Sequence, residues 1–136
     1  MPKVKINNSQ GLVQVAGGGI ALYGATQSIL ANNVASNAKI YSTTSLVLGT
    51  SGNNGHKIQL PVIGKLTAGH TIIVSNNDAA QDFILQTADN GTRMNGVAGG
   101  PCAVTLGQKT AVKCVYSGAA NPGWIVIVGD QAVVPS

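Results

Sequence analysis

The chain has 136 residues, of which 9% are charged and 44% are hydrophobic, and its formal net charge is +4. One core is sufficient, because a chain of this length buries roughly two-thirds of its unfolded surface in a single domain. The Lys and Arg residues are scattered rather than grouped, which excludes the basic run or stripe of a typical nucleic-acid-binding surface.

The N-terminal sequence, MPKVKINNSQ, lacks the apolar core of a signal peptide. No segment approaches the roughly twenty apolar residues of a membrane-spanning helix. We therefore expect a soluble protein that is synthesised in the cytoplasm and binds neither nucleic acid nor membrane.

Short apolar or alternating segments bounded by Gly, Asn, Pro or Ser recur along the chain, which is typical of short strands in a sandwich or barrel. In chain order they are residues 3–6, 12–15, 20–23, 27–31, 38–42, 45–48, 56–60, 71–75, 82–87, 103–106, 110–117 and 124–128. Glu is absent and 18 residues are Gly, which disfavours helices. The sequence therefore predicts an all-β fold, an antiparallel β-sandwich.

The segment 25–38 has a competing interpretation as a helix, because Ile29, Leu30 and Val34 have near-helical spacing. Its Ser, Asn and Thr content favours two strands. The triple glycine at 17–19 divides an N-terminal arm, residues 1–19, from a single β-sandwich domain, residues 20–136. Glycine gives this joint little backbone stiffness.

The two cysteines are predicted to face each other across a hairpin. If Gly107–Lys109 is a three-residue loop, Cys102 lies opposite Cys114. A four-residue loop would shift the register by one and break this pair. Because disulfides are rare in the cytoplasm, buried free thiols are favoured over a bridge formed later.

Three segments, 72–74, 83–85 and 124–128, are apolar at every position, whereas a strand with one solvated face should alternate. A second sheet covers one face in a small domain. A neighbouring subunit is a good candidate to cover the other, so the sequence predicts a homo-oligomer.

Catalytic and metal-binding patterns are sparse. His56 and His70 each follow a glycine and are interpreted as exposed turn residues. Asp78, Asp82 and Asp89 faintly resemble a calcium site, but turn formation explains them more simply. We expect no enzymatic activity, no catalytic residue, no metal and no cofactor.

The order of strand and turn signals resembles a β-rich module of tailed-bacteriophage virion proteins, found in capsid decoration (cement) proteins and in the tips of tail fibres and spikes. The resemblance covers about four-fifths of the chain. It rests on the segments Gly24–Gln27 with Leu30, Ile58–Pro61, Ala68–Asn76, Phe83–Leu85, Met94–Gly96, Val104–Gly107 and Gly123–Val126. It implies a jelly-roll-like or other antiparallel sandwich, usually trimeric, without enzymatic activity.

A decoration protein is expected rather than a fibre, because the chain is short and has no stalk, coiled-coil heptads or collagen-like repeat. Such a protein is made in the host cytoplasm and attaches to the major capsid protein on the virion surface. The expected capsid contacts are Lys3, Val4, Lys5, Ile6, Leu12, Val13 and Val15 of the arm. Trp124, Ile125 and Ile127 are expected in the oligomer contact or the core.

The main alternative is a tail fibre or spike tip that binds a host receptor or glycan. Asparagines could hydrogen-bond sugars, while few aromatic residues are available to stack on them, and Phe83 and Trp124 look buried. The asparagines are Asn53, Asn54, Asn76, Asn77 and Asn121, and the tyrosines are Tyr23, Tyr41 and Tyr116. A small hydrolase is a third, weaker alternative.

Overall fold

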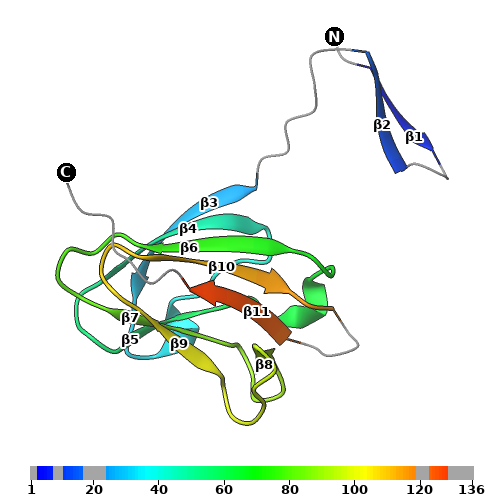
Figure 1. Cartoon of the computed structure of the whole chain (residues 1–136). Helices are drawn as coiled ribbons and strands as arrows, with labels where there is room; N and C mark the ends of the chain where they lie inside the picture. Colours follow the sequence, from blue (N-terminus) through cyan, green and yellow to red (C-terminus); the bar gives the residue numbers. More distant parts are fainter. Residues whose placement is uncertain (1–2, 8–10, 17–23, 119–122, 129–136) are drawn as a thin grey trace.

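The structure is a computed structural model that describes residues 3–7, 11–16, 24–118 and 123–128 (Figure 1). The strands are β1 (Lys3–Asn7), β2 (Gly11–Ala16), β3 (Ala25–Ala31), β4 (Thr44–Ser51), β5 (His56–Gln59), β6 (Thr71–Asn76), β7 (Phe83–Gln86), β8 (Arg93–Met94), β9 (Ala103–Leu106), β10 (Ala111–Tyr116) and β11 (Gly123–Val128). Two short 3₁₀ helices, η1 (Ala35–Asn37) and η2 (Ile63–Lys65), complete the described elements. The prediction of a β-rich fold is confirmed.

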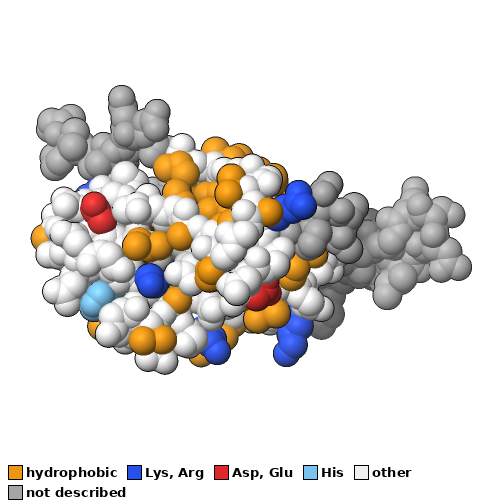
Figure 2. Space-filling view, turned by 90° about the horizontal axis from the view of Figure 1, so that it is seen from below, with side chains coloured by type: hydrophobic (Ala, Val, Ile, Leu, Met, Phe, Trp, Pro, Cys, Tyr) orange, Lys and Arg blue, Asp and Glu red, His pale blue; other side chains and the backbone are white. Residues whose placement is uncertain are grey.

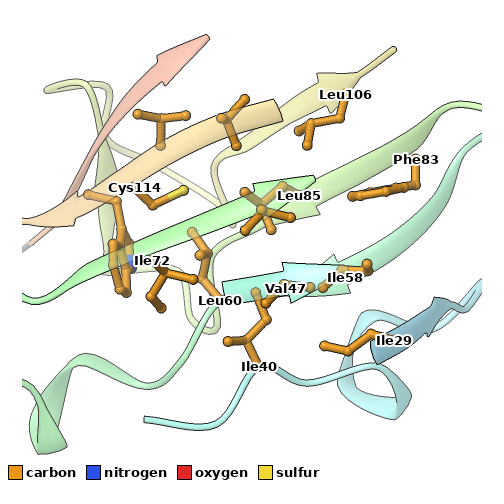
Figure 3. Packing of buried hydrophobic residues seen from close by; sticks show 14 of the residues in the cluster. Ile29, Ile40, Val47, Ile58, Leu60, Ile72, Phe83, Leu85, Leu106 and Cys114 are labelled. Atoms are coloured by element: carbon orange, nitrogen blue, oxygen red, sulfur yellow. The ribbon is translucent and has the colours of Figure 1, made fainter. Parts of the chain in front are cut away.

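The strands form two main sheets and a separate hairpin. The six-stranded sheet has the order β3-β4-β6-β10-β11-β8, and the three-stranded sheet has the order β5-β7-β9. The two sheets enclose one hydrophobic cluster, part of which Figure 3 shows. Strands β1 and β2 pair with each other in an antiparallel two-stranded sheet.

Both main sheets are mixed, so the prediction of an antiparallel sandwich is wrong in this respect. Pairs β3–β4, β4–β6, β5–β7 and β8–β11 are parallel. Parallel neighbours cannot be joined by a tight turn and need a longer crossover connection. For β4–β6 and β5–β7 that connection includes a strand of the other sheet, since β5 lies between β4 and β6 in the chain, and β6 lies between β5 and β7.

Most predicted strands lie where the sequence placed them, with three exceptions. Segment 38–42 is not a strand, and Lys39 forms only an isolated parallel bridge with Gln59. Segment 25–38 contains one strand, β3, followed by the 3₁₀ turn η1 rather than a second strand. Segment 20–23 and the triple glycine lie outside the described residues, so the division into arm and domain remains a prediction.

The predicted cysteine pair is wrong, because β9 and β10 belong to different sheets. β9 pairs with β7, while Cys114 on β10 lies opposite Ile72 and Val126. Residues 107–110 therefore carry the chain from one sheet to the other instead of closing a hairpin, and Lys109 adopts a positive φ of 56° there. Both cysteines are buried free thiols.

The core lies between the two sheets (Figure 3). Ile58 and Leu85 of the smaller sheet and Val47 of the larger sheet are fully buried. Phe83 lies against Gly49 of β4, where a Cβ atom would be 2.7 Å from the ring Cζ atom. The absence of a side chain at this glycine therefore allows the phenyl ring to pack against the opposite sheet.

One polar side chain, that of Asn76 at the end of β6, is also fully buried. Its Nδ2 atom donates to the carbonyl oxygens of Gln81 and Leu106, each at 3.0 Å. Its Oδ1 atom accepts a hydrogen bond from the backbone N–H of Asp78 at 3.0 Å. Asn76 thereby joins the end of β6 to the end of β9 in the other sheet.

We predict that Asn76→Asp lowers the free energy of unfolding by about 2–4 kcal/mol, because a carboxylate cannot donate to the two carbonyl oxygens and would be buried without a counter-charge. Urea denaturation at neutral pH measures this. The matched control is Asn77→Asp, which changes the neighbouring exposed residue and keeps the oxygen that accepts from Ser75. Equal stability of the two variants would contradict the role assigned to Asn76.

Candidate interaction surface

Along β11, the side chains alternate between the core and the surface. Trp124 and Val126 point into the core, where Trp124 is 1% exposed and its ring centroid lies 6.0 Å from that of Tyr116. Ile125 and Ile127 point the other way and are 45% and 58% exposed. Of the three residues expected in the oligomer contact or core, Trp124 therefore lies in the core and the two isoleucines lie on the surface.

The neighbouring strands extend this surface. Lys113 of β10 pairs with Ile127 on one side and with Ile73 of β6 on the other, and Ile73 is 44% exposed. Val115, the next outward residue of β10, pairs with Ile125. Directly opposed residues have Cβ atoms about 5 Å apart, so these side chains form one continuous surface. We call it the apolar outer face, and it consists of Ile73, Lys113, Val115, Ile125 and Ile127.

The sequence predicts strands with apolar residues on both faces, and β6 and β11 have them. Each of β6 and β11 buries alternate residues in the core and exposes isoleucine on its other side. In β7 the outward residue, Ile84, is half-buried. No described element covers the apolar outer face, and large exposed apolar patches are typical of interaction sites.

The charges on this side of the sheet are positive. Lys113 lies at the centre of the apolar outer face, and Arg93 of β8 pairs with Gly123 at its margin. The outward positions of β4, β6, β10 and β11 carry no acidic residue. Lys113 therefore lies among apolar side chains, with no acidic residue at the outward positions of these strands.

Figure 2 shows another face of the molecule, seen from below relative to Figure 1. The few Lys, Arg, Asp and His side chains there are widely spaced, and hydrophobic side chains lie between them. Charged groups therefore contribute little to this face.

The asparagines proposed for sugar binding do not form one surface. Asn53, Asn54 and Asn77 are exposed, whereas Asn76 is buried and Asn121 lies outside the described residues. Asn54 accepts a hydrogen bond from the backbone N–H of Asp82 through its Oδ1 atom at 2.8 Å.

The tyrosines considered with these asparagines are divided in the same way. Tyr41 is 65% exposed, Tyr116 is buried, and Tyr23 lies outside the described residues. The expectation that Phe83 and Trp124 are buried is confirmed.

The two histidines are half-buried, so their interpretation as exposed turn residues is wrong. The Nδ1 atom of His56 lies 3.2 Å from the carbonyl oxygen of Ala31 on the adjacent edge strand. The Nε2 atom of His70 is buried and has no hydrogen-bond partner among the described residues.

The aspartates stabilise turns. Asp78 accepts hydrogen bonds from the backbone N–H groups of Ala80, Gln81 and Ser51, and the bond from Ala80 is the main reason that its pKa lies below the ordinary value. Asp89 accepts from the hydroxyl group of Thr92 at 2.7 Å. Within the described residues, no group of three or more His, Cys, Asp or Glu side chains could hold a metal ion.

The seven capsid-contact residues predicted from the sequence all belong to the β1–β2 hairpin. The backbone register pairs Lys5 with Val13 and Ile6 with Leu12. They therefore lie on two paired strands, at the segments 3–6 and 12–15 where the sequence predicts strands. Their contact with a capsid stays a prediction.

Sequence reasoning assigned the outer isoleucines to a contact but did not identify Lys113 and Arg93 as their neighbours. The available signal was the alternation in β10, which placed Lys113 on the exposed face of its strand. Its neighbours depend on which strands flank β10, and that information is not contained in the local pattern.

Comparison with protein-family models and with curated proteins gives no match for this chain. Among the described residues, no helix is long and apolar enough to cross a membrane.

The two thiols provide a test of the core. Burial raises the pKa of the Cys114 thiol to about 12, and the Sγ atom of Cys102 donates to the carbonyl oxygen of Val97 at 3.2 Å. In a Cys102→Ala variant at pH 8, we predict that Cys114 reacts with a disulfide reagent on the order of 10³-fold more slowly than in denaturant, because the thiolate is the reactive form. Equal rates in native and denaturing buffer would show that Cys114 is accessible.

Proposed function

We propose that this protein is a non-catalytic structural subunit of a tailed-phage particle, a decoration protein that binds the major capsid protein on the head surface as a homotrimer. The observation that carries the proposal is the apolar outer face, where Ile73, Ile125 and Ile127 surround Lys113. A protein built to remain a monomer would place charged residues there.

The geometry favours a ring over a two-fold dimer. A two-fold contact centred on the apolar outer face would bring Lys113 close to Lys113 of the second copy, and like charges oppose association. A ring contact places this face against a different surface of the neighbouring copy. The smallest closed ring of this type after the dimer is a trimer.

The phage assignment rests on the resemblance described for the sequence, which also implies a jelly-roll-like sandwich and the absence of enzymatic activity. In a trimer, each arm makes a modest contact with the major capsid protein. Three linked contacts raise the effective concentration of each arm at its site, so firm attachment to the head follows without any single strong contact.

A receptor-binding tail fibre or spike tip is the second candidate. The observation that favours it is the exposure of Tyr41, together with the exposed asparagines Asn53 and Asn54. Aromatic rings and side-chain amides are the groups expected in a sugar-binding site.

We predict that Ile125→Lys dissociates the trimer, because it adds a second positive charge beside Lys113 and removes apolar contact area. Light scattering coupled to size-exclusion chromatography gives the mass of each variant. Val62→Lys is the matched control, since Val62 is 60% exposed and lies outside this face. The same mass for Ile125→Lys and wild type would contradict assembly through the apolar outer face.

Binding to the particle separates the two candidate functions. A decoration protein co-sediments with purified phage heads that lack it, and the monomeric Ile125→Lys variant should bind at least about tenfold more weakly, since it loses the linked contacts. Binding to host cells but not to heads would identify the tail-tip function instead.

A further inference from the structure

The strand β3 is an edge of the six-stranded sheet, and it meets the smaller sheet at its C-terminal end, where Asn32 bridges Lys57 and the Ala31 carbonyl oxygen lies 3.2 Å from His56 Nδ1. It is seven residues long and pairs with β4 on one side only. Its sequence, ATQSILA, contains no charged residue and no proline. Half of the backbone groups of an edge strand point away from the sheet, and proteins usually protect long edges with charges, proline or short length.

The other edge strands of the two main sheets, β5, β8 and β9, are shorter, and two of them carry a charge that opposes pairing with another chain. β8 has two residues, one of which is Arg93. β5 has four residues, includes Lys57, and is bridged on its outer side by Lys39 and Asn32. β9 has four residues. β3 is thus the longest edge without a charge in the two main sheets.

A groove of about 400 Å³ runs beside β3. One wall is Gln27–Leu30 of the strand, and the other is formed by residues 36–39 and Tyr41. Gln27 fixes this second wall, because its Nε2 atom donates to the carbonyl oxygen of Lys39 at 2.7 Å and its Oε1 atom accepts from the N–H of Tyr41 at 3.1 Å. The free edge therefore borders a preformed groove.

The chain itself contains a strand suited to this edge. β2, with the sequence GLVQVA, has no charged residue, whereas its hairpin partner β1 carries Lys3 and Lys5. In a two-stranded hairpin each strand has one free edge, and β2 is paired only with β1. In the single chain, β2 and β3 belong to separate sheets, so the chain's own hairpin does not occupy the β3 edge.

We propose that β2 of one copy pairs with the free edge of β3 in a neighbouring copy, so that the hairpin extends the six-stranded sheet by two strands. Main-chain hydrogen bonds provide affinity in such strand addition, and the alternating side chains provide specificity. β1 then becomes the new edge, where Lys3 and Lys5 prevent addition of further strands and keep the assembly closed.

This inference rests on the proposed homo-oligomer and specifies a second contact within it. The test uses the full chain with the photoreactive residue p-benzoylphenylalanine in place of Val13 of β2. Oligomers assembled from mixed isotopically heavy and light chains are irradiated, and mass spectrometry identifies the joined peptides. We expect residue 13 to be joined to the β3 segment, residues 25–31, with heavy and light chains combined in one product.

A pair of variants tests whether the edge itself is required. Ser28→Lys adds a charge to the exposed side of β3, and Thr50→Lys adds the same charge to β4, one strand in from the edge. We expect Ser28→Lys to lower the yield of the cross-link about tenfold, equivalent to about 1.4 kcal/mol, and Thr50→Lys to leave it unchanged.

The outcomes distinguish the two proposals. An oligomer that yields no cross-link to β3, or one whose cross-links join residue 13 only to its own chain, would overturn strand addition while leaving assembly through the apolar outer face intact. A wild-type monomer in light scattering would overturn the proposed oligomer itself.

Discussion

The burial of one face of each sheet in a single shared core is the constraint on which the rest of the structure depends. The core contains the inward residues of the two main sheets and is closed at one point by the contact of Phe83 with Gly49. Stacked sheets lie about 10 Å apart, so side chains fill the space between them completely. Among the described residues, no third layer lies over the second face of either sheet.

Because the core occupies only one face of each sheet, the outward isoleucines bear on whether the other face is buried in an assembly. Ile73, Ile125 and Ile127 could have been polar at no cost to the core, because they point away from it. Their burial in a neighbouring subunit would recover hydrophobic free energy that the monomer leaves unused, at about 25 cal/mol per Å² of apolar area removed from water. Lys113 lies among these isoleucines, and its positive charge would have to be matched by any surface that binds them. This requirement favours specific over non-specific association.

Most strands could be predicted from the sequence because they are short, apolar or alternating, and bounded by turn residues, whereas the two-residue strand β8 was missed. The pairing of the strands could not. A period of two residues shows which side chains share a face, but it is silent on which strand lies alongside, so Cys102 and Cys114 were placed in one hairpin although their strands belong to different sheets. The loop between them was interpreted as a tight reversal when it carries the chain across the core.

For the candidate surface, the apolar residues of one strand could be predicted from the sequence, but the residues beside them could not. The apolar pattern of residues 124–128 predicts that both faces of that strand are covered; β11 buries Trp124 in the core, whereas Ile125 on its other face is exposed in the single chain. The positions of Lys113 and Arg93 beside it follow from the order of strands in the sheet. That order arises from packing over the whole chain.

The central claim is that the apolar outer face is covered in the assembled protein. Carbene footprinting with mass spectrometry measures this directly, because a photogenerated carbene labels side chains in proportion to their exposure. In the assembled protein we predict weak labelling of Ile73, Ile125 and Ile127 and strong labelling of Val62, although all four are exposed in the single chain. Equal labelling of the three isoleucines and Val62 would contradict the account.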